Sequence, residues 1–343
     1  MDTFDASDAP ASAPKKGRPW LRWLASVGVL AIAVAIVRHV DGRALLEAFR
    51  KARVELLLLA SLFSVGNLWC KAWVWRTMLP ASETLTTARQ FRYTIAAYST
   101  SALTPARAGE AMRIWLLHRN HGISVAQSTG VALAEKVLDS LALIILAAPL
   151  PWLMPMLPPQ TAHVLAYLAL ATVGLLVIAA VASHRLKPDG IVARYLRHIR
   201  ILRESGTFAC ALLACGVAWV FDLATLWVSL VALRIDASFC IAVFTLLAIN
   251  LALVIPSTPA SVGALEATAV VALGLFGVAR VDAVAFGLLY HTAQLAPLFA
   301  LAAILAKGTL RLQAPAVRKL VGEPHAPSRS TSPLAGTDSN SRC

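Results

Sequence analysis

The chain has 343 residues, of which 58% are hydrophobic and 14% charged, with a mean hydropathy of +0.69. These values exclude an ordinary soluble globular domain and indicate a membrane protein. A net charge of +13 also suits a nucleic-acid-binding protein, but the basic residues stand at the ends of apolar runs, as membrane topology requires. We therefore expect membrane lipids as partners and no nucleic acid.

Several apolar runs are long enough to cross, as helices, a hydrocarbon core about 30 Å thick. Two shorter apolar stretches, 93–104 and 239–255, each run into a motif that contains proline and glycine. The sequence thus predicts an all-α polytopic membrane protein with about six full transmembrane helices plus two broken or re-entrant helical hairpins, or eight spans if the hairpins are counted. The six predicted spans are 20–37, 54–75, 124–150, 162–182, 207–233 and 283–306.

Composition divides the chain into three parts. Both ends are rich in Ala, Ser, Pro, Asp and Thr, which is typical of disorder. The parts are a disordered cytoplasmic N-terminus at 1–19, a transmembrane domain at 20–308, and a C-terminal tail at 309–343 that is first basic and then disordered.

The positions of the basic residues predict the orientation of the chain. Basic residues before the first apolar run favour an uncleaved signal-anchor, with both termini in the cytoplasm. The basic segment 184–204 then also lies in the cytoplasm. The basic loop 38–53 would lie outside, against the rule, unless it forms a short helix on the membrane surface.

No motif for catalysis, nucleotide binding or zinc binding occurs in the sequence. The five cysteines show no metal-binding spacing, and most lie in apolar runs, where cysteine behaves as a small hydrophobic residue. We expect no disulfide framework, no metal, no cofactor and no enzymatic activity.

A six-residue pattern recurs at the two hairpins. It reads TPARAG at 104–109 and TPASVG at 258–263. With the predicted orientation, the first hairpin enters the membrane from the cytoplasm and the second from the opposite side. The order span, broken hairpin, span therefore occurs twice with opposite orientation, which is typical of inverted-repeat transporters. The alternative is chance recurrence of Pro and Gly where helices break.

The Thr-Pro pairs predict where helices begin. A threonine hydroxyl can cap free N–H groups and proline fits the first helical position, so we expect helix starts near Pro105 and Pro259. A helix N-terminus attracts anions because its N–H groups are unpaired and carry partial positive charge. Thr104, Thr258 and the turn glycines Gly109 and Gly263 thus join the expected substrate site.

Charged residues next to the first turn supply the expected headgroup contacts. Arg107 and Arg113 can grip a phosphate, and Glu110, three residues from each, can orient both. The alternative is that the two arginines extend to the cytoplasmic headgroups while Glu110 neutralises them.

Ionisable residues also occur inside the apolar runs. Such groups are costly in lipid and usually face a cavity, a partner or an ion path. We expect them to line the path or couple ions, with internal ion pairing as the alternative. They are Glu135, Lys136, Asp139, Asp222 and Glu266. Three polar residues, Asn250, His291 and Gln294, are expected to hydrogen-bond between helices.

These motifs carry a family resemblance. The run SALTPARAGEAMRIWLLHRNHGISVAQSTGVALAEKVLDSLALIIL has an R-x-G-E-x-x-R core, followed by Glu135, Lys136 and Asp139. It resembles the lysylphosphatidylglycerol synthase transmembrane region, also called the flippase-like family. The later Pro259, Gly263 and Glu266 resemble a second signature of that family, Pro-x-x-x-Gly-x-x-Glu. The resemblance extends over residues 20–308.

The resemblance implies a multi-pass protein of the bacterial or archaeal inner membrane that moves lipids or lipid-linked molecules between leaflets. About 35 residues follow the last span, too few for the soluble synthase domain, so we expect no synthase activity. Without an ATP-binding motif, transport is expected to be ion-coupled or passive.

Two other functions fit the same residues. One is a membrane-embedded lipid transferase with Glu110 and Glu266 as general acid and base. The other is a non-transporting accessory subunit of a lipid-synthesis system. For any of these functions, the candidate protein partners are a second copy of the chain or a lipid-synthesis protein.

Overall fold

The computed structural model describes residues 42–79, 84–104, 108–153, 205–253 and 259–320, with a few positions between 163 and 174. The regular elements of this part are helices. The chain divides into two units, residues 1–302 and 303–343, and the site described below belongs to the first. The predicted span 20–37, most of 162–182 and the two tails expected to be disordered lie outside the described residues.

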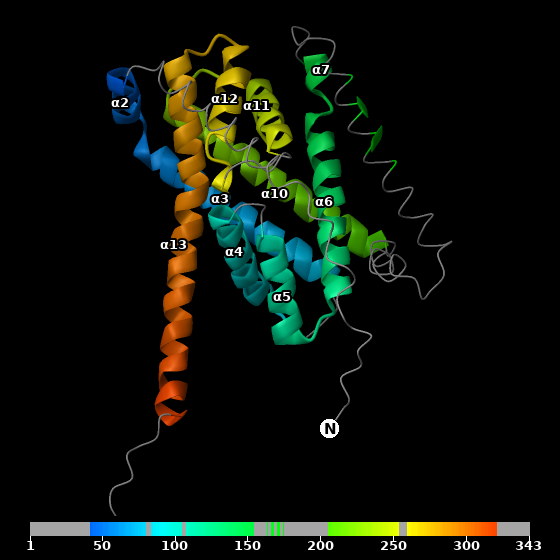
Figure 1. The fold of residues 1–343 in the computed structure, drawn as a ribbon. Coiled ribbons are helices and arrows are strands. Elements are labelled where there is room, and N and C mark those ends of the chain that lie inside the picture. The colour runs from blue at the N-terminus through cyan, green and yellow to red at the C-terminus, as the bar shows by residue number, and fades with distance from the viewer. Residues whose placement is uncertain are drawn as a thin grey trace, which may run out of the picture. The chain divides into compact units, whose positions relative to one another are not determined.

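The N-terminal half contains a short helix, a long helix, a two-helix hairpin and a second long helix (Figure 1). The spans predicted at 54–75 and 124–150 are confirmed as helices, and the short helix expected within 38–53 is α2. The elements are α2 (Gly42–Lys51), α3 (Val54–Met78), α4 (Thr87–Leu103), α5 (Gly109–His121), α6 (Val125–Ala147) and α7 (Leu150–Leu153).

The C-terminal half repeats the order long helix, hairpin, long helix. The helix predicted at 207–233 is α10, and the one predicted at 283–306 lies within a longer helix that continues past the predicted domain end at 308. The elements are α10 (Ser205–Ala232), α11 (Phe239–Ala252), the 3₁₀ turn η3 (Pro259–Ser261), α12 (Ala264–Gly274) and α13 (Arg280–Leu320).

Length and composition separate the long helices from the hairpin helices. Among the described residues, Val54–Met78, Gly206–Ala232 and Arg280–Ala306 are long and apolar enough to cross a membrane. Helix α6 has 23 residues but carries three charged side chains near its middle. The hairpin helices have 11 to 17 residues, fewer than the roughly 20 that a spanning helix needs. Broken hairpins therefore fit these four helices, and the total number of spans stays a prediction.

Local sequence signals fix several helix ends. Thr86, Ser124 and Ser238 cap α4, α6 and α11, because each side-chain oxygen accepts a hydrogen bond from the backbone N–H three residues later. Helix α5 ends at Gly122, whose φ of 64° is a left-handed conformation that glycine adopts without strain.

The first hairpin helix begins later than the Thr-Pro pair predicts. Helix α5 starts at Gly109 rather than near Pro105, and its N-cap is Ala108. The Thr104 hydroxyl donates to the carbonyl of Thr100 at 2.6 Å, so Thr104 ends α4 instead of capping α5. The prediction of a Thr104 cap is therefore wrong.

The second hairpin helix is also displaced. Residues Pro259–Ser261 form a 3₁₀ turn, and α12 begins at Ala264 after the N-cap Gly263, whose φ is 86°. The Gly263 N–H donates to Glu266 Oε2 at 2.6 Å, so a carboxylate within the first turn stabilises this helix start. Pro105, Arg107 and Thr258 lie outside the described residues.

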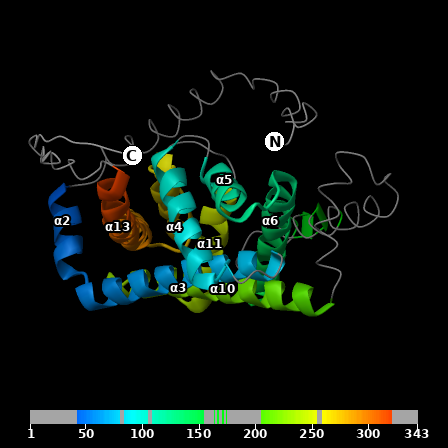
Figure 2. The ribbon, with the colours of Figure 1, turned by 90° about the horizontal axis from the view of Figure 1, so that it is seen from below.

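The two halves pack through their first long helices. Helices α3 and α10 run side by side (Figure 2). The side chain of Asn67 donates to the carbonyl of Ala218 at 2.8 Å, and Gly66 leaves room for the Phe221 ring. An amide hydrogen bond and a small residue at the contact are typical of helix packing in membranes.

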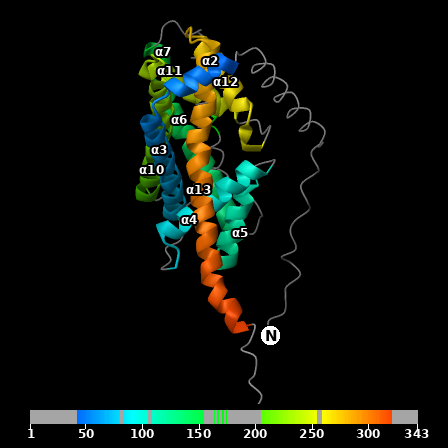
Figure 3. The ribbon, with the colours of Figure 1, turned by 90° about the vertical axis from the view of Figure 1, so that its left-hand side faces the viewer.

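The two hairpins approach from opposite ends of these long helices. The α4–α5 hairpin and the α11–α12 hairpin lie at opposite ends, and α4 contacts η3 where their turns meet (Figures 1 and 3). This arrangement matches the inverted repeat that the recurring TPAxxG pattern predicts. It brings the turns of the two hairpins together.

Candidate functional site

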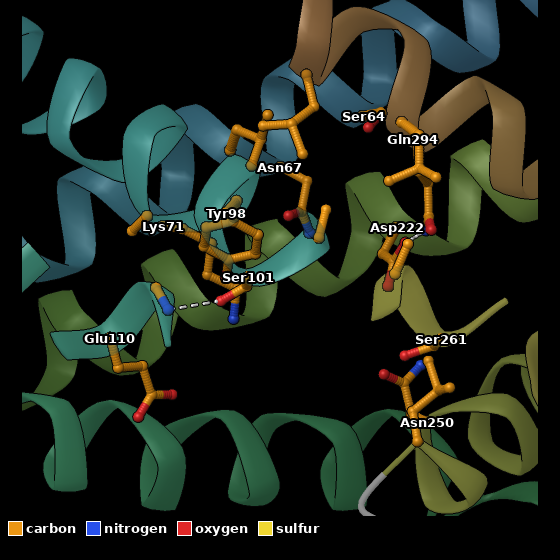
Figure 4. Close-up of a pocket in the computed structure, with 18 of the residues that line it drawn as sticks. Ser64, Asn67, Lys71, Tyr98, Ser101, Glu110, Asp222, Asn250, Ser261 and Gln294 are labelled. Atoms are coloured by element: carbon orange, nitrogen blue, oxygen red, sulfur yellow. Dashed lines mark hydrogen bonds between the residues drawn. The ribbon is translucent and has the colours of Figure 1, made fainter. Parts of the chain in front are cut away.

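A cavity of about 380 Å³ lies where the two hairpin turns meet. Its walls come from both hairpins and from the long helices α3, α6, α10 and α13. Figure 4 shows Lys71, Tyr98 and Glu110 on one side of it and Asp222, Asn250 and Gln294 on the other. Because polar side chains from distant parts of the sequence converge here among apolar helices, this cavity is the candidate site.

Arg113 and Glu135 form a buried ion pair at the cavity wall. Arg113 Nη1 lies 3.8 Å from Glu135 Oε2, and both residues are 4% exposed. The same Glu135 oxygen accepts a hydrogen bond from Trp75 Nε1 at 2.6 Å. The guanidinium carbon lies 4.5 Å from the centre of a Trp75 ring and 5.6 Å from that of Tyr98. Charge and cation–π contacts therefore hold Arg113 in place.

Two buried polar atoms of this pair retain hydrogen-bonding capacity. Arg113 Nε and Glu135 Oε1 have no hydrogen-bond partner within the described part of the chain. Such atoms are rare in folded proteins because each carries a desolvation cost. Both residues line the cavity, but these two atoms are themselves buried, so the Arg113 and Glu135 pair keeps unused hydrogen-bonding groups just behind the cavity wall.

Lys71 of α3 is a buried cation at the cavity wall. This buried side chain donates to Asp139 of α6 and lies 5.8 Å from the centre of a Trp219 ring. Trp219 of α10 in turn donates to the backbone carbonyl of Asp139 at 3.0 Å. Three helices from the two repeats are thus joined at Lys71 and Asp139.

Lys136 and Glu110 form the most accessible ion pair of the cavity. Lys136 Nζ lies 2.8 Å from Glu110 Oε1, and the two side chains are 55% and 54% exposed. The sequence predicts that Glu110 orients Arg113, but the ion-pair partner of Glu110 in the described part of the chain is Lys136 of α6. The pairing differs because Arg113 turns towards Trp75 and Glu135.

The second repeat contributes two carboxylates. Asp222 Oδ1 accepts hydrogen bonds from Tyr290 at 3.0 Å and from Gln294 at 3.1 Å. Glu266 Oε1 lies 2.8 Å from His291 Nδ1. Helix α10 thus contacts α13 through Asp222, and α12 contacts α13 through Glu266.

Gly109 allows the first hairpin to close. A Cβ added to Gly109 would collide with the backbone carbonyl of Ala97 and with Ser101 Oγ. The Gly109 N–H also donates to Ser101 Oγ at 3.1 Å, as the dashed line in Figure 4 shows. The role of this glycine in the structure is therefore close packing of α5 on α4 beside the cavity.

Most of the predicted site residues meet at the cavity. Those that line it are Thr104, Gly109, Glu110, Arg113, Glu135, Lys136, Asp139 and Asp222. Glu266 and Gly263 lie at the start of α12. Glu266 contacts His291, and His291 lines the cavity. Arg107 and Thr258 lie outside the described residues.

Sequence reasoning missed Lys71, Trp75, Tyr98 and Ser101. Lys71 stands alone in the apolar run NLWCKAWVW, and a single buried lysine inside a span is itself a signal of function. The aromatic residues gave no such signal, since tryptophan and tyrosine are common in membrane helices.

Polar residues of α11 and α13 divide into two groups. The interhelical hydrogen bonds predicted for His291 and Gln294 are confirmed, to Glu266 and Asp222. The prediction for Asn250 is wrong, because its side chain donates to Leu246 of its own helix at 2.9 Å. Among the described residues, no three His, Cys, Asp or Glu side chains form a group that suits a metal ion.

The helices and the polar cavity define a multi-pass α-helical membrane protein. Residues 22–302 match the family model described as the lysylphosphatidylglycerol synthase TM region. The chain belongs to this family, whose name connects it with membrane lipid metabolism. No curated protein matches the chain.

Proposed function

We propose that this protein moves a lipid with an anionic headgroup, or a lipid-linked anion, between the leaflets of the bacterial inner membrane. The carrying observation is the polar cavity at the meeting point of two hairpins that come from opposite ends of the long helices. A headgroup in such a cavity is shielded from hydrocarbon, while its acyl chains stay among lipids. The proposal needs no chemical change in the lipid.

Three cations of the cavity support an anionic headgroup. Lys71, Arg113 and Lys136 each pair with a carboxylate. An incoming phosphate can take the place of that carboxylate, so the cation keeps an anionic partner. Helix α5 also begins at the cavity with Gly109 and Glu110. Its N-terminus, which carries partial positive charge, therefore lies at the cavity. Arg107, outside the described residues, stays a further candidate for headgroup binding.

The opposed hairpins support alternating access. In inverted-repeat transporters, one repeat moves against the other around a site at their interface. Here several ion pairs join helices within one repeat, such as Lys71 to Asp139 and Glu266 to His291. A displacement between repeats leaves these pairs intact and changes which end of the cavity is open.

Replacement of Lys136 by Gln is expected to reduce the amount of anionic lipid that stays bound to the purified protein. Its side chain is 55% exposed and reaches the cavity, so its loss removes a phosphate partner without leaving a deeply buried charge. Mass spectrometry of co-purified lipids measures the change. The matched control is Lys51→Gln, which removes the same charge from an exposed position on α2.

Equal lipid retention by the Lys136→Gln and Lys51→Gln proteins contradicts a headgroup site at the cavity. Loss of anionic lipid in the first variant alone supports the proposal. A protein-dependent change in lipid mass would instead favour a membrane-embedded transferase, for which the Glu266 and His291 pair offers proton-transfer groups 2.8 Å apart.

A further inference from the structure

Asp222 differs from the other carboxylates at the cavity in its partners. Glu110, Glu135 and Asp139 each face a lysine or arginine, and Glu266 faces His291. Asp222 receives hydrogen bonds from a phenol and an amide, which carry no charge. Both bonds end on Oδ1, and within the described part of the chain no hydrogen bond reaches Oδ2.

The surroundings of Asp222 leave a surplus negative charge. Helix α10 packs on α3, α6 and α11 and is joined to α13 by hydrogen bonds. The titratable groups of these helices that act electrostatically on Asp222 are Lys71 of α3, Asp139 of α6 and Tyr290 of α13, while α11 carries no charged side chain. Lys71 already donates to Asp139, so two carboxylates share one ammonium group.

Protonation of Asp222 removes this surplus negative charge. An uncompensated carboxylate among membrane helices is costly, whereas a protonated one can donate from Oδ2 into the cavity. We propose that Asp222 is a proton-binding site and that protonation and release at its carboxylate couple the proton gradient to movement of the lipid. The coupling part of this inference rests on the proposed function.

Lys71 supplies a physical link between the proton and the two repeats. In the structure Lys71 pairs with Asp139 of its own repeat. A neutral Asp222 does not compete for this lysine. When Asp222 releases its proton to water, its charge attracts Lys71 across the contact between α3 and α10. The proton thus changes the electrostatic attraction between the repeats, which is the requirement for a coupled transporter.

Infrared spectroscopy of the purified protein tests the proton site without any transport. The probe is the proton itself, added by titration from alkaline to acid pH, and the readout is the carboxylic C=O stretch of a protonated acid. Asp222→Asn keeps an oxygen that accepts from Tyr290 and Gln294 but cannot titrate. Asp236→Asn, in the exposed loop between α10 and α11, is the matched control.

Exposed carboxyls protonate near about pH 4, so the diagnostic signal is a C=O band that appears while the pH is still well above that range. We expect this band to persist in Asp236→Asn and to be lost in Asp222→Asn. An unchanged band in a folded Asp222→Asn protein overturns the proton site. In vesicles that carry fluorescent phosphatidylglycerol, a pH gradient is expected to accelerate lipid movement by the wild type and not by Asp222→Asn. If the wild type moves the lipid at the same rate with and without the gradient, the coupling is overturned, but the proposed function is not.

Discussion

The Arg113→Ala variant is expected to lose about 3–5 kcal/mol of unfolding free energy. Removal of the guanidinium leaves Glu135, which is 4% exposed, without the cation that faces it at 3.8 Å. It also removes the cation–π contacts with Trp75 and Tyr98. Unfolding of the protein by SDS titration in mixed micelles measures the loss.

Two further variants distinguish a stability loss caused by the broken ion pair from one caused by general destabilisation of α5. Arg119→Ala removes an exposed arginine of the same helix that stacks on Trp115, and its cost is expected to stay below about 1 kcal/mol. The double variant Arg113→Met/Glu135→Leu removes both charges and is expected to recover most of the lost stability. Equal stability of Arg113→Ala and Arg119→Ala contradicts a structural ion pair.

The Gly109→Ala variant is expected to lose about 1–3 kcal/mol of unfolding free energy because of overpacking at the hairpin turn. The added Cβ collides with the backbone carbonyl of Ala97, which cannot move as a flexible side chain does. The hairpin must then open, and the cavity beside it changes shape. Thermal denaturation followed by size-exclusion chromatography measures the effect.

Gly216→Ala is the matched control for this substitution. Gly216 lies inside α10, and a Cβ added there meets no atom within 4 Å. Because alanine favours the helix, this variant is expected to be as stable as the wild type or to gain up to about 1 kcal/mol. A Gly109→Ala protein that matches Gly216→Ala would contradict the close packing of α4 and α5.

The long helices and the repeated hairpins follow from the sequence because their signals are local. The lengths of the apolar runs predict α3, α10 and the first part of α13, and the TPAxxG pattern marks both hairpin turns. Charged residues in apolar runs indicate a polar site, since only a cavity or partner offsets their cost in lipid. Glu135, Asp139 and Asp222 were found in this way, and the structure places all three at one cavity.

The pairing of these charges depends on tertiary contacts and could not be predicted from spacing. Glu110 is three residues from Arg113, yet it pairs with Lys136 of another helix, because Arg113 stacks on Trp75. The late start of α12 at Ala264 has a similar cause. Glu266 caps its own helix while His291 from α13 fixes that carboxylate, and neither contact is visible in the TPASVG pattern.

Lipid movement by the purified protein in vesicles tests the central claim most directly. Vesicles carry fluorescent phosphatidylglycerol in both leaflets, and a reductant that cannot cross the membrane reports how fast inner lipid reaches the outside, with and without a pH gradient. We expect the wild type to move the lipid faster than protein-free vesicles, and the Glu110→Gln/Lys136→Gln variant to move it more slowly than the wild type. Folded wild-type protein that leaves the lipid at the protein-free rate under both conditions would contradict a translocator.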